Sequence, residues 1–187
     1  MTTPDNLVRA AASCALLFLA CATPAAAADC TALLRQHLQT DLTLPFAEFD
    51  QNDAAGWRAL SAAGCESEAA VLIEQYIAAQ ERPHPVLTWH RAQMLAMAGD
   101  YGTAIQVARL TLRPEDGKAK SEFRWNDYVH ATIAFLQGDQ ASLELFRERL
   151  AVATATFPIN RPNLVSVDRL QSCFGQPYKA AYSCGKK

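Results

Sequence analysis

The histidines are the residues of this chain best suited to acid–base or metal chemistry, and two of them have a suggestive spacing. His90 and His130 fall at nearly equivalent points of two neighbouring helical segments, from which they could face one metal ion or substrate. Histidines on helices are more often partly buried and hydrogen-bonded, and no carboxylate pair stands out as a general acid and base. The sequence also contains no Gly-x-Ser-x-Gly elbow, no His-Glu-x-x-His motif and no phosphate- or calcium-binding loop. We therefore predict no enzyme, no cofactor and no metal, with catalysis by His90 or His130 as the least favoured alternative.

The cysteines beyond residue 28 predict disulfide bonds. They are Cys30, Cys65, Cys173 and Cys184, and they include neither a Cys-x-x-Cys motif nor a histidine at metal-ligand spacing. An even number of cysteines in an exported chain indicates two disulfides, for which three pairings exist. Pairing neighbours along the chain, Cys30–Cys65 and Cys173–Cys184, is the simplest of the three.

The first 28 residues predict export. Arg9 precedes an apolar run, and small residues lead up to a cleavage site near Ala28, which is the pattern of a signal peptide. Residues 29–187 would then be a single domain, periplasmic or secreted. The alternative is a lipoprotein anchored through Cys21, because the residues before it loosely resemble a bacterial lipobox. No later segment is long and apolar enough to predict a membrane span, and the formal net charge of −2 gives no reason to expect nucleic acid.

The central element of the predicted fold is a helical hairpin over residues 86–112, which contains His90. Apolar residues recur at helical spacing on both sides of Gly99-Asp100. Gly99 suits the left-handed position just past a helix end, and Asp100 can accept hydrogen bonds from the first amides of the next helix. Similar breaks occur at Gly138-Asp139 and, more weakly, at Gly64-Cys65. The sequence therefore predicts an all-α fold of about three helical hairpins.

The two ends of the domain differ from the hairpins. A helix is predicted over residues 30–40, and packed helical segments over residues 165–182. Pro158 and Pro162 predict a loop over residues 154–163. Because stacks of hairpins need covers over their end faces, we expect the two ends to act as disulfide-tied caps.

Residues 86–112 resemble a tetratricopeptide repeat. The resemblance rests on Ala92, Leu95, the Gly99-Asp100-Tyr101 turn and Ala104-Ile105, whereas Ala108 stands where the family prefers an aromatic residue. Residues 124–150 match more loosely and residues 53–80 only weakly. The resemblance implies a short right-handed stack of hairpins with a concave groove for protein or peptide segments, and it brings no catalytic residues with it.

The resemblance also implies which side chains line the groove, because one face of each unit's first helix does so in that family. On this sequence the face holds Arg58, Trp89, Gln93, Trp125, Tyr128 and Thr132. Trp, Tyr and Arg often carry the binding energy of interfaces. The alternative is that Trp89 and Tyr128 fill the core between neighbouring hairpins.

The function expected from these observations is protein or peptide binding in the cell envelope by a monomeric, exported module. A second hypothesis is an inhibitor or immunity-type protein for an envelope toxin, a role that small disulfide-tied exported domains can fill. Preferring the module over the inhibitor reflects what such folds usually do.

Overall fold

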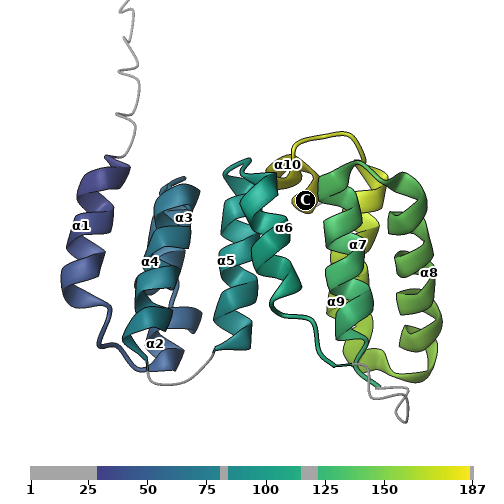
Figure 1. The fold of residues 1–187 in the computed structure, drawn as a ribbon, viewed down its shortest axis with the longest axis horizontal. Helices are drawn as coiled ribbons and strands as arrows, with labels where there is room; N and C mark the ends of the chain where they lie inside the picture. Colours follow the sequence, from purple (N-terminus) through teal and green to yellow (C-terminus); the bar gives the residue numbers. More distant parts are fainter. Residues whose placement is uncertain (1–28, 81–83, 115–121, 186–187) are drawn as a thin grey trace, which may run out of the picture.

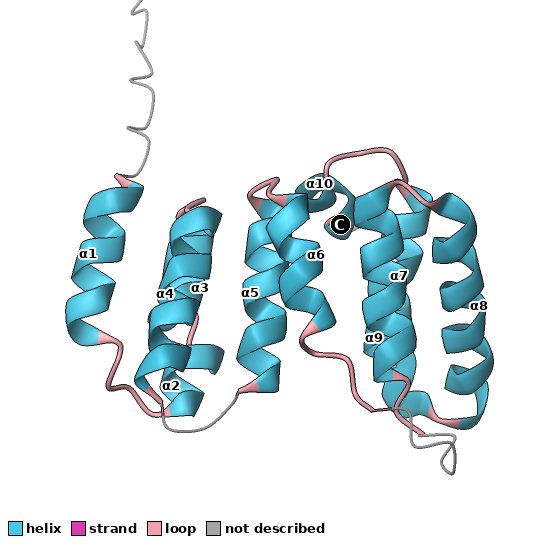
Figure 2. Ribbon diagram, in the orientation of Figure 1, coloured by secondary structure: helices cyan, strands magenta, loops and turns pink. Residues whose placement is uncertain are grey.

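A computed structural model describes residues 29–80, 84–114 and 122–185 of the chain. The predicted signal peptide (residues 1–28) and Cys21 lie outside the described residues. The described part is helical and contains no strand, so the predicted all-α class is confirmed (Figure 2). None of the helices in this part combines the length and the apolar character that crossing a membrane requires.

The helices stand side by side in a row (Figure 1). In chain order they are α1 (Cys30–Thr40), α2 (Phe46–Gln51), α3 (Gly56–Ala62), α4 (Glu66–Ala79), α5 (Pro85–Met97), α6 (Tyr101–Arg109), α7 (Trp125–Gln137), α8 (Gln140–Thr156), a 3-10 turn η1 (Pro158–Asn160), α9 (Arg161–Ser172) and α10 (Tyr178–Tyr182). Helices α3 and α4, α5 and α6, and α7 and α8 pack as successive pairs, and α9 packs against α7 and α8. Helix α1 lies at one end of the row and α8 at the other (Figure 1).

The turns between paired helices follow from the glycines and aspartates that occupy them. Gly99 and Gly138 have φ values of 89° and 71°, in the left-handed region that favours glycine. Asp100 accepts a hydrogen bond from the amide of Thr103 at 3.1 Å. Asp139 caps α8 in the same way. Each pair of residues therefore ends one helix and starts the next, as the sequence predicts.

Two hydrophobic clusters form the interior. The N-terminal core contains Phe49, Trp57, Leu60, Leu72, Ile73, Tyr76, Leu87 and Met94. The C-terminal core contains Trp89, Tyr128, Val129, Phe135, Leu143, Leu150, Val167, Leu170 and Tyr178. Helix α5 contributes to both clusters, and Leu95 and Met97 pack against both. The two cores are thus joined through one continuous helix.

Disulfides tie down both ends of the row. Cys30–Cys65 joins the start of α1 to the residue before α4, and Cys173–Cys184 joins the end of α9 to the residues after α10. Both bonds are those of the neighbour pairing expected from the sequence. An α1 helix with no fully buried residue of its own is in this way held against the N-terminal core.

Helix α10 bridges the two halves of the molecule. The amide of Tyr178 donates to the hydroxyl of Tyr101 on α6 at 2.9 Å. Lys179 forms an ion pair with Glu66 at the start of α4 at 2.5 Å. The side chain of Tyr178 is fully buried in the C-terminal core. A short helix near the end of the chain therefore contacts elements that belong to both cores.

The loop predicted over residues 154–163 is wrong. Helix α8 continues to Thr156, and α9 already begins at Arg161. Pro158 and Pro162 stand in the first turn of η1 and α9, where a helix does not use the missing N–H. The prolines of this segment start helices instead of interrupting them.

Candidate functional site

A buried carboxylate on α2 contacts side chains of α3 and α5 in the N-terminal half of the molecule. Asp50, near the end of α2, is 0% exposed. Its Oδ1 accepts a hydrogen bond from the indole Nε1 of Trp57 on α3 at 3.0 Å. The same oxygen lies 2.6 Å from Nδ1 of His90 on α5. Arg58 adds a bond from its Nε to the backbone carbonyl of Asp50, and its guanidinium lies over the Trp57 ring. We call Asp50, Trp57, Arg58 and His90 the Asp50 cluster.

A glycine allows α2 and α3 to meet closely enough to build this cluster. Gly56, the first residue of α3, has a φ of 56°, and a Cβ added there would collide with the carbonyl oxygen of Phe49. The amide of Gly56 donates to the Asp41 carboxylate at 2.8 Å, and Asp41 in turn contacts His37 on α1 at 2.6 Å. Two Asp–His pairs therefore fix the turns around the N-terminal core.

The electrostatics of the Asp50 cluster favour an ionised carboxylate. Burial raises the pKa of Asp50. The hydrogen bond from His90, the charge of His90 and the hydrogen bond from Trp57 together lower it by more, so the pKa of Asp50 lies below its usual value. For the pKa of Asp41, burial is likewise outweighed by hydrogen bonds from Thr40, His37 and Gly56. Both carboxylates therefore carry their charge at neutral pH.

An Asp–His pair of this kind is one component of general-base catalysis, because the carboxylate orients the imidazole. Among the described residues, however, no serine, threonine or cysteine side chain is hydrogen-bonded to His90. His90 also does not line the pocket described below. Within the described residues the pair joins α2, α3 and α5 through the contacts of Asp50 with Trp57 and His90.

The structure does not bring His90 and His130 to a common site. His90 contacts Asp50 and Trp57 in the N-terminal half, whereas the ring of His130 stacks on Phe146 of α8 with centroids 4.9 Å apart. In the described part of the chain the two histidines share no partner. Nor do Cys30, Cys65 and Glu68, whose side chains lie close together, offer a metal site, because the two sulfurs form a disulfide instead of thiolates.

The residues predicted to line a concave groove are mostly interior. Trp89, Gln93, Tyr128 and Thr132 are buried, so the expectation that they form an exposed groove is wrong and the core alternative holds for Trp89 and Tyr128. The sequence pattern does bring aromatic rings together, since Trp89 lies 5.0 Å from Tyr128 and 5.2 Å from Trp125 between ring centroids. Trp125 is half-buried, and Arg58 lies apart in the Asp50 cluster.

The chain's own C-terminal helix contributes to this burial at Gln93 and Tyr128. The amide Nε2 of Gln93 lies 3.3 Å from the hydroxyl of Tyr182 and 3.4 Å from that of Tyr128. Tyr178 packs against Phe135 of α7. Burial, together with the neighbouring Tyr178 and Tyr182 hydroxyls, raises the pKa of Tyr128 well above its usual value. Helix α10 thus covers Gln93 and Tyr128, which belong to the surface that the repeat resemblance assigns to a ligand.

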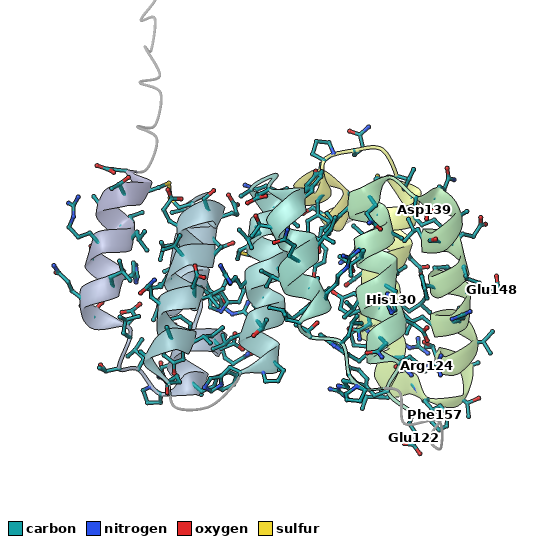
Figure 3. All side chains as sticks on the ribbon, in the orientation of Figure 1. Glu122, Arg124, His130, Asp139, Glu148 and Phe157 are labelled. Atoms are coloured by element: carbon teal, nitrogen blue, oxygen red, sulfur yellow. A yellow bond between two sulfur atoms is a disulfide. The ribbon has the colours of Figure 1, made fainter. Side chains whose placement is uncertain are left out.

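A different surface, on α8, combines exposure, a pocket and charge. A pocket of about 460 Å³ is lined by Arg124, Leu145, Glu148, Arg149, Val152, Ala153, Thr156 and Phe157. Leu145 is 48% exposed and Val152 is 67% exposed, although both are large apolar residues. Glu148 points outward from the helix, and Arg124 and Phe157 lie toward one end of it (Figure 3). We call Leu145, Glu148, Arg149 and Val152 the α8 face.

Neither Arg149 nor Glu148 takes part in a salt bridge within the described residues, and the guanidinium of Arg149 lies 5.4 Å from the centroid of the Phe146 ring. Sequence reasoning missed this surface. The signal was present, because Leu145 and Val152 are two helical turns apart and lie off the buried stripe that holds Leu143 and Leu150.

No protein-family model matches the chain, and neither a curated protein nor a solved structure matches it.

Proposed function

We propose that this chain is an exported helical-hairpin module that binds a protein partner through the α8 face. The observation that carries the proposal is the pair of exposed apolar side chains, Leu145 and Val152, beside a pocket of about 460 Å³. An apolar patch with a polar rim is typical of protein interaction sites. Arg149 and Glu148 supply that rim, and they would add specificity and orientation to the contact.

The architecture supports binding over catalysis. The tetratricopeptide-like arrangement of paired helices is a scaffold on which binding surfaces recur. In this chain α10 occupies the surface between α5 and α7, so the binding surface proposed here lies at the end of the row instead. The Asp50 cluster, which includes the histidine considered for catalysis, has its hydrogen bonds directed into the protein.

The proposed location is the periplasm or the medium. Two disulfides suit an oxidising compartment, and the N-terminal sequence has the pattern of a cleaved signal peptide ending near Ala28. Lipid attachment at Cys21 is the alternative, and the mass of the exported protein separates the two.

A site-specific photo-crosslinker tests the function. Introduced at Val152 in the producing cells, it should give a discrete adduct of defined mass, because this side chain would lie inside the interface. The matched control is the same crosslinker at Leu110, which is 75% exposed on another part of the molecule. Identical adducts at both positions, or none at Val152, would overturn the proposal.

A further inference from the structure

We infer that the Cys173–Cys184 disulfide is a redox switch for α10: while it is formed it holds α10 against the body of the molecule, and its reduction by a dithiol releases the helix. The inference concerns the surface under α10. It therefore does not depend on the binding function proposed for the α8 face.

The position of this disulfide gives it control over α10. Cys173 directly follows α9, which contributes Val167 and Leu170 to the C-terminal core, and Cys184 lies two residues after the end of α10. All five residues of α10 thus lie inside the loop that the disulfide closes. A helix of one turn is unstable in water by itself. Helix α10 consequently depends on being held at both ends.

The contacts that hold α10 can be exchanged for water. Three of them are polar and join the helix to Glu66, Tyr101 and Gln93. Water can replace the partner in each of these contacts, so that their loss costs little net free energy. The Lys179 side chain of the ion pair is 56% exposed and is already largely solvated. Two of the five residues of α10 are buried, so the apolar area that opposes release is small.

A reductant in solution has access to this disulfide. Cys173 and Cys184 are both partly exposed. In the other disulfide Cys65 is only 1% exposed, so a reductant can approach that bond only at Cys30. Because thiol–disulfide exchange requires a thiolate to reach a disulfide sulfur, we expect Cys173–Cys184 to be reduced first.

The reduction is a two-step exchange with a dithiol. One thiolate of the dithiol attacks the Sγ atom of one cysteine, forms a mixed disulfide with it and displaces the other cysteine as a thiolate. The second thiol of the reductant then attacks the mixed disulfide and closes a disulfide within the reductant. The dithiol thereby gives up two electrons and two protons, and Cys173 and Cys184 become thiols.

Reduction increases the fraction of molecules in which α10 has left the body. A disulfide across a sequence separation of 11 residues disfavours open conformations of its loop by a factor of roughly 100, so its loss should raise the released fraction by about that factor. Release uncovers Gln93 and Tyr128, which are 9% and 3% exposed in the closed molecule. The reduced protein therefore presents a second surface on α5 and α7, with an amide and a phenol hydroxyl available for hydrogen bonds.

Amide hydrogen exchange followed by NMR tests the inference on the purified chain with both disulfides formed. The amide of Tyr178 is the reporter, because it is bonded to the Tyr101 hydroxyl only while α10 is in place. In Cys173→Ser/Cys184→Ser this amide should exchange about 100-fold faster than in the unchanged chain. Its rate should not depend on low concentrations of urea, because release of a short helix exposes little surface, whereas the rate of the Ile133 amide within α7 should rise with urea.

The matched control is Cys30→Ser/Cys65→Ser, which removes the disulfide that does not enclose α10 and should leave the exchange rate of the Tyr178 amide unchanged. Stepwise reduction of the unchanged chain with dithiothreitol provides a second measurement that needs no substitution. Alkylation and peptide mass analysis should find Cys173 and Cys184 modified while Cys30 and Cys65 are still joined. The Tyr178 amide of this half-reduced protein should exchange as fast as in Cys173→Ser/Cys184→Ser.

Three results would overturn the inference. The first is reduction of Cys30–Cys65 before Cys173–Cys184. The second is a Tyr178 amide that exchanges equally fast with and without its disulfide. The third is a Tyr178 amide whose rate rises with urea as steeply as that of Ile133, because α10 would then leave only when the whole molecule unfolds.

Discussion

Replacing Asp50 by asparagine removes a buried negative charge that contacts Trp57 and His90 in the N-terminal half of the molecule. The asparagine side chain would keep the shape of the aspartate and one acceptor oxygen. Its NH₂ group, however, would be a donor among the donors of Trp57, His90 and Gln51 that now face the carboxylate. Removing one member of a buried charged network costs about 3–5 kcal/mol. Since domains of this kind unfold with about 5–15 kcal/mol, the loss is a large fraction of the total.

Urea unfolding followed by far-UV circular dichroism at pH 7 measures this loss. With a denaturant dependence of about 2 kcal/mol per M, Asp50→Asn should lower the midpoint by roughly 2 M. The matched control is Asp168→Asn, which removes the charge of a 41% exposed carboxylate 2.7 Å from Arg147. Such surface pairs contribute about 0–1 kcal/mol, so the control midpoint should move by less than roughly 0.5 M. Equal shifts in the two variants would refute the reasoning.

The pH dependence separates charge from shape. The pKa of Asp50 is lower in the folded than in the unfolded state, so the unfolded state binds more protons in the acid range. Its contribution to stability is complete above about pH 4 and is lost as the pH falls below that value. The gap in stability between the unchanged chain and Asp50→Asn should therefore shrink as the pH is lowered through that value. If the stability difference between the unchanged chain and Asp50→Asn stays constant with pH, the destabilisation is caused by packing and not by the lost charge.

Three further changes have predictable effects. Cys30→Ser/Cys65→Ser should lower the free energy of unfolding by about 4 kcal/mol, because the disulfide closes a 35-residue separation; thermal unfolding in oxidising buffer checks this. Gly56→Ala should destabilise more than Gly99→Ala in urea, because both have positive φ but only the first would drive a Cβ into a carbonyl oxygen. Asp41→Asn should flatten the acid limb of the stability curve, because the pKa of Asp41 is lowered in the folded state and its contribution disappears as the pH falls below about 4. An unchanged acid limb would contradict the last expectation.

Features that depend on neighbouring residues could be predicted from the sequence. The Gly99-Asp100 and Gly138-Asp139 turns follow from the conformational freedom of glycine and the capping ability of aspartate within a few residues. The helical class follows from apolar periodicity, which is also local. The prolines misled the prediction because proline breaks the interior of a helix but fits its first turn.

Apart from the disulfide pairing, contacts between distant residues could not be predicted. Gln93 is hydrogen-bonded to Tyr182, which lies 89 residues later, and no pattern in the sequence around Gln93 predicts this hydrogen bond. His90 contacts Asp50, which lies 40 residues earlier in the chain. The sequence offered only the helical spacing of His90 to His130, and that spacing does not indicate the contact with Asp50. The periodicity identifies which residues of a helix share a face, but it does not identify which chain segment covers that face.

Helix α10 has a consequence for the order in which the contacts of the molecule form. A polypeptide is synthesised from its N-terminus onward, so Tyr178 and Lys179 are made after the other helices that contribute to the two cores. Without those residues, the two cores are joined through α5, which packs against α4 on one side and α6 on the other. The contacts of α10 with Glu66, Tyr101 and Gln93 form after the rest of the chain has been made, and they connect α10 to α4, α6 and α5. A chain that ends before α10 would lack these three contacts and the two core residues Tyr178 and Ala181.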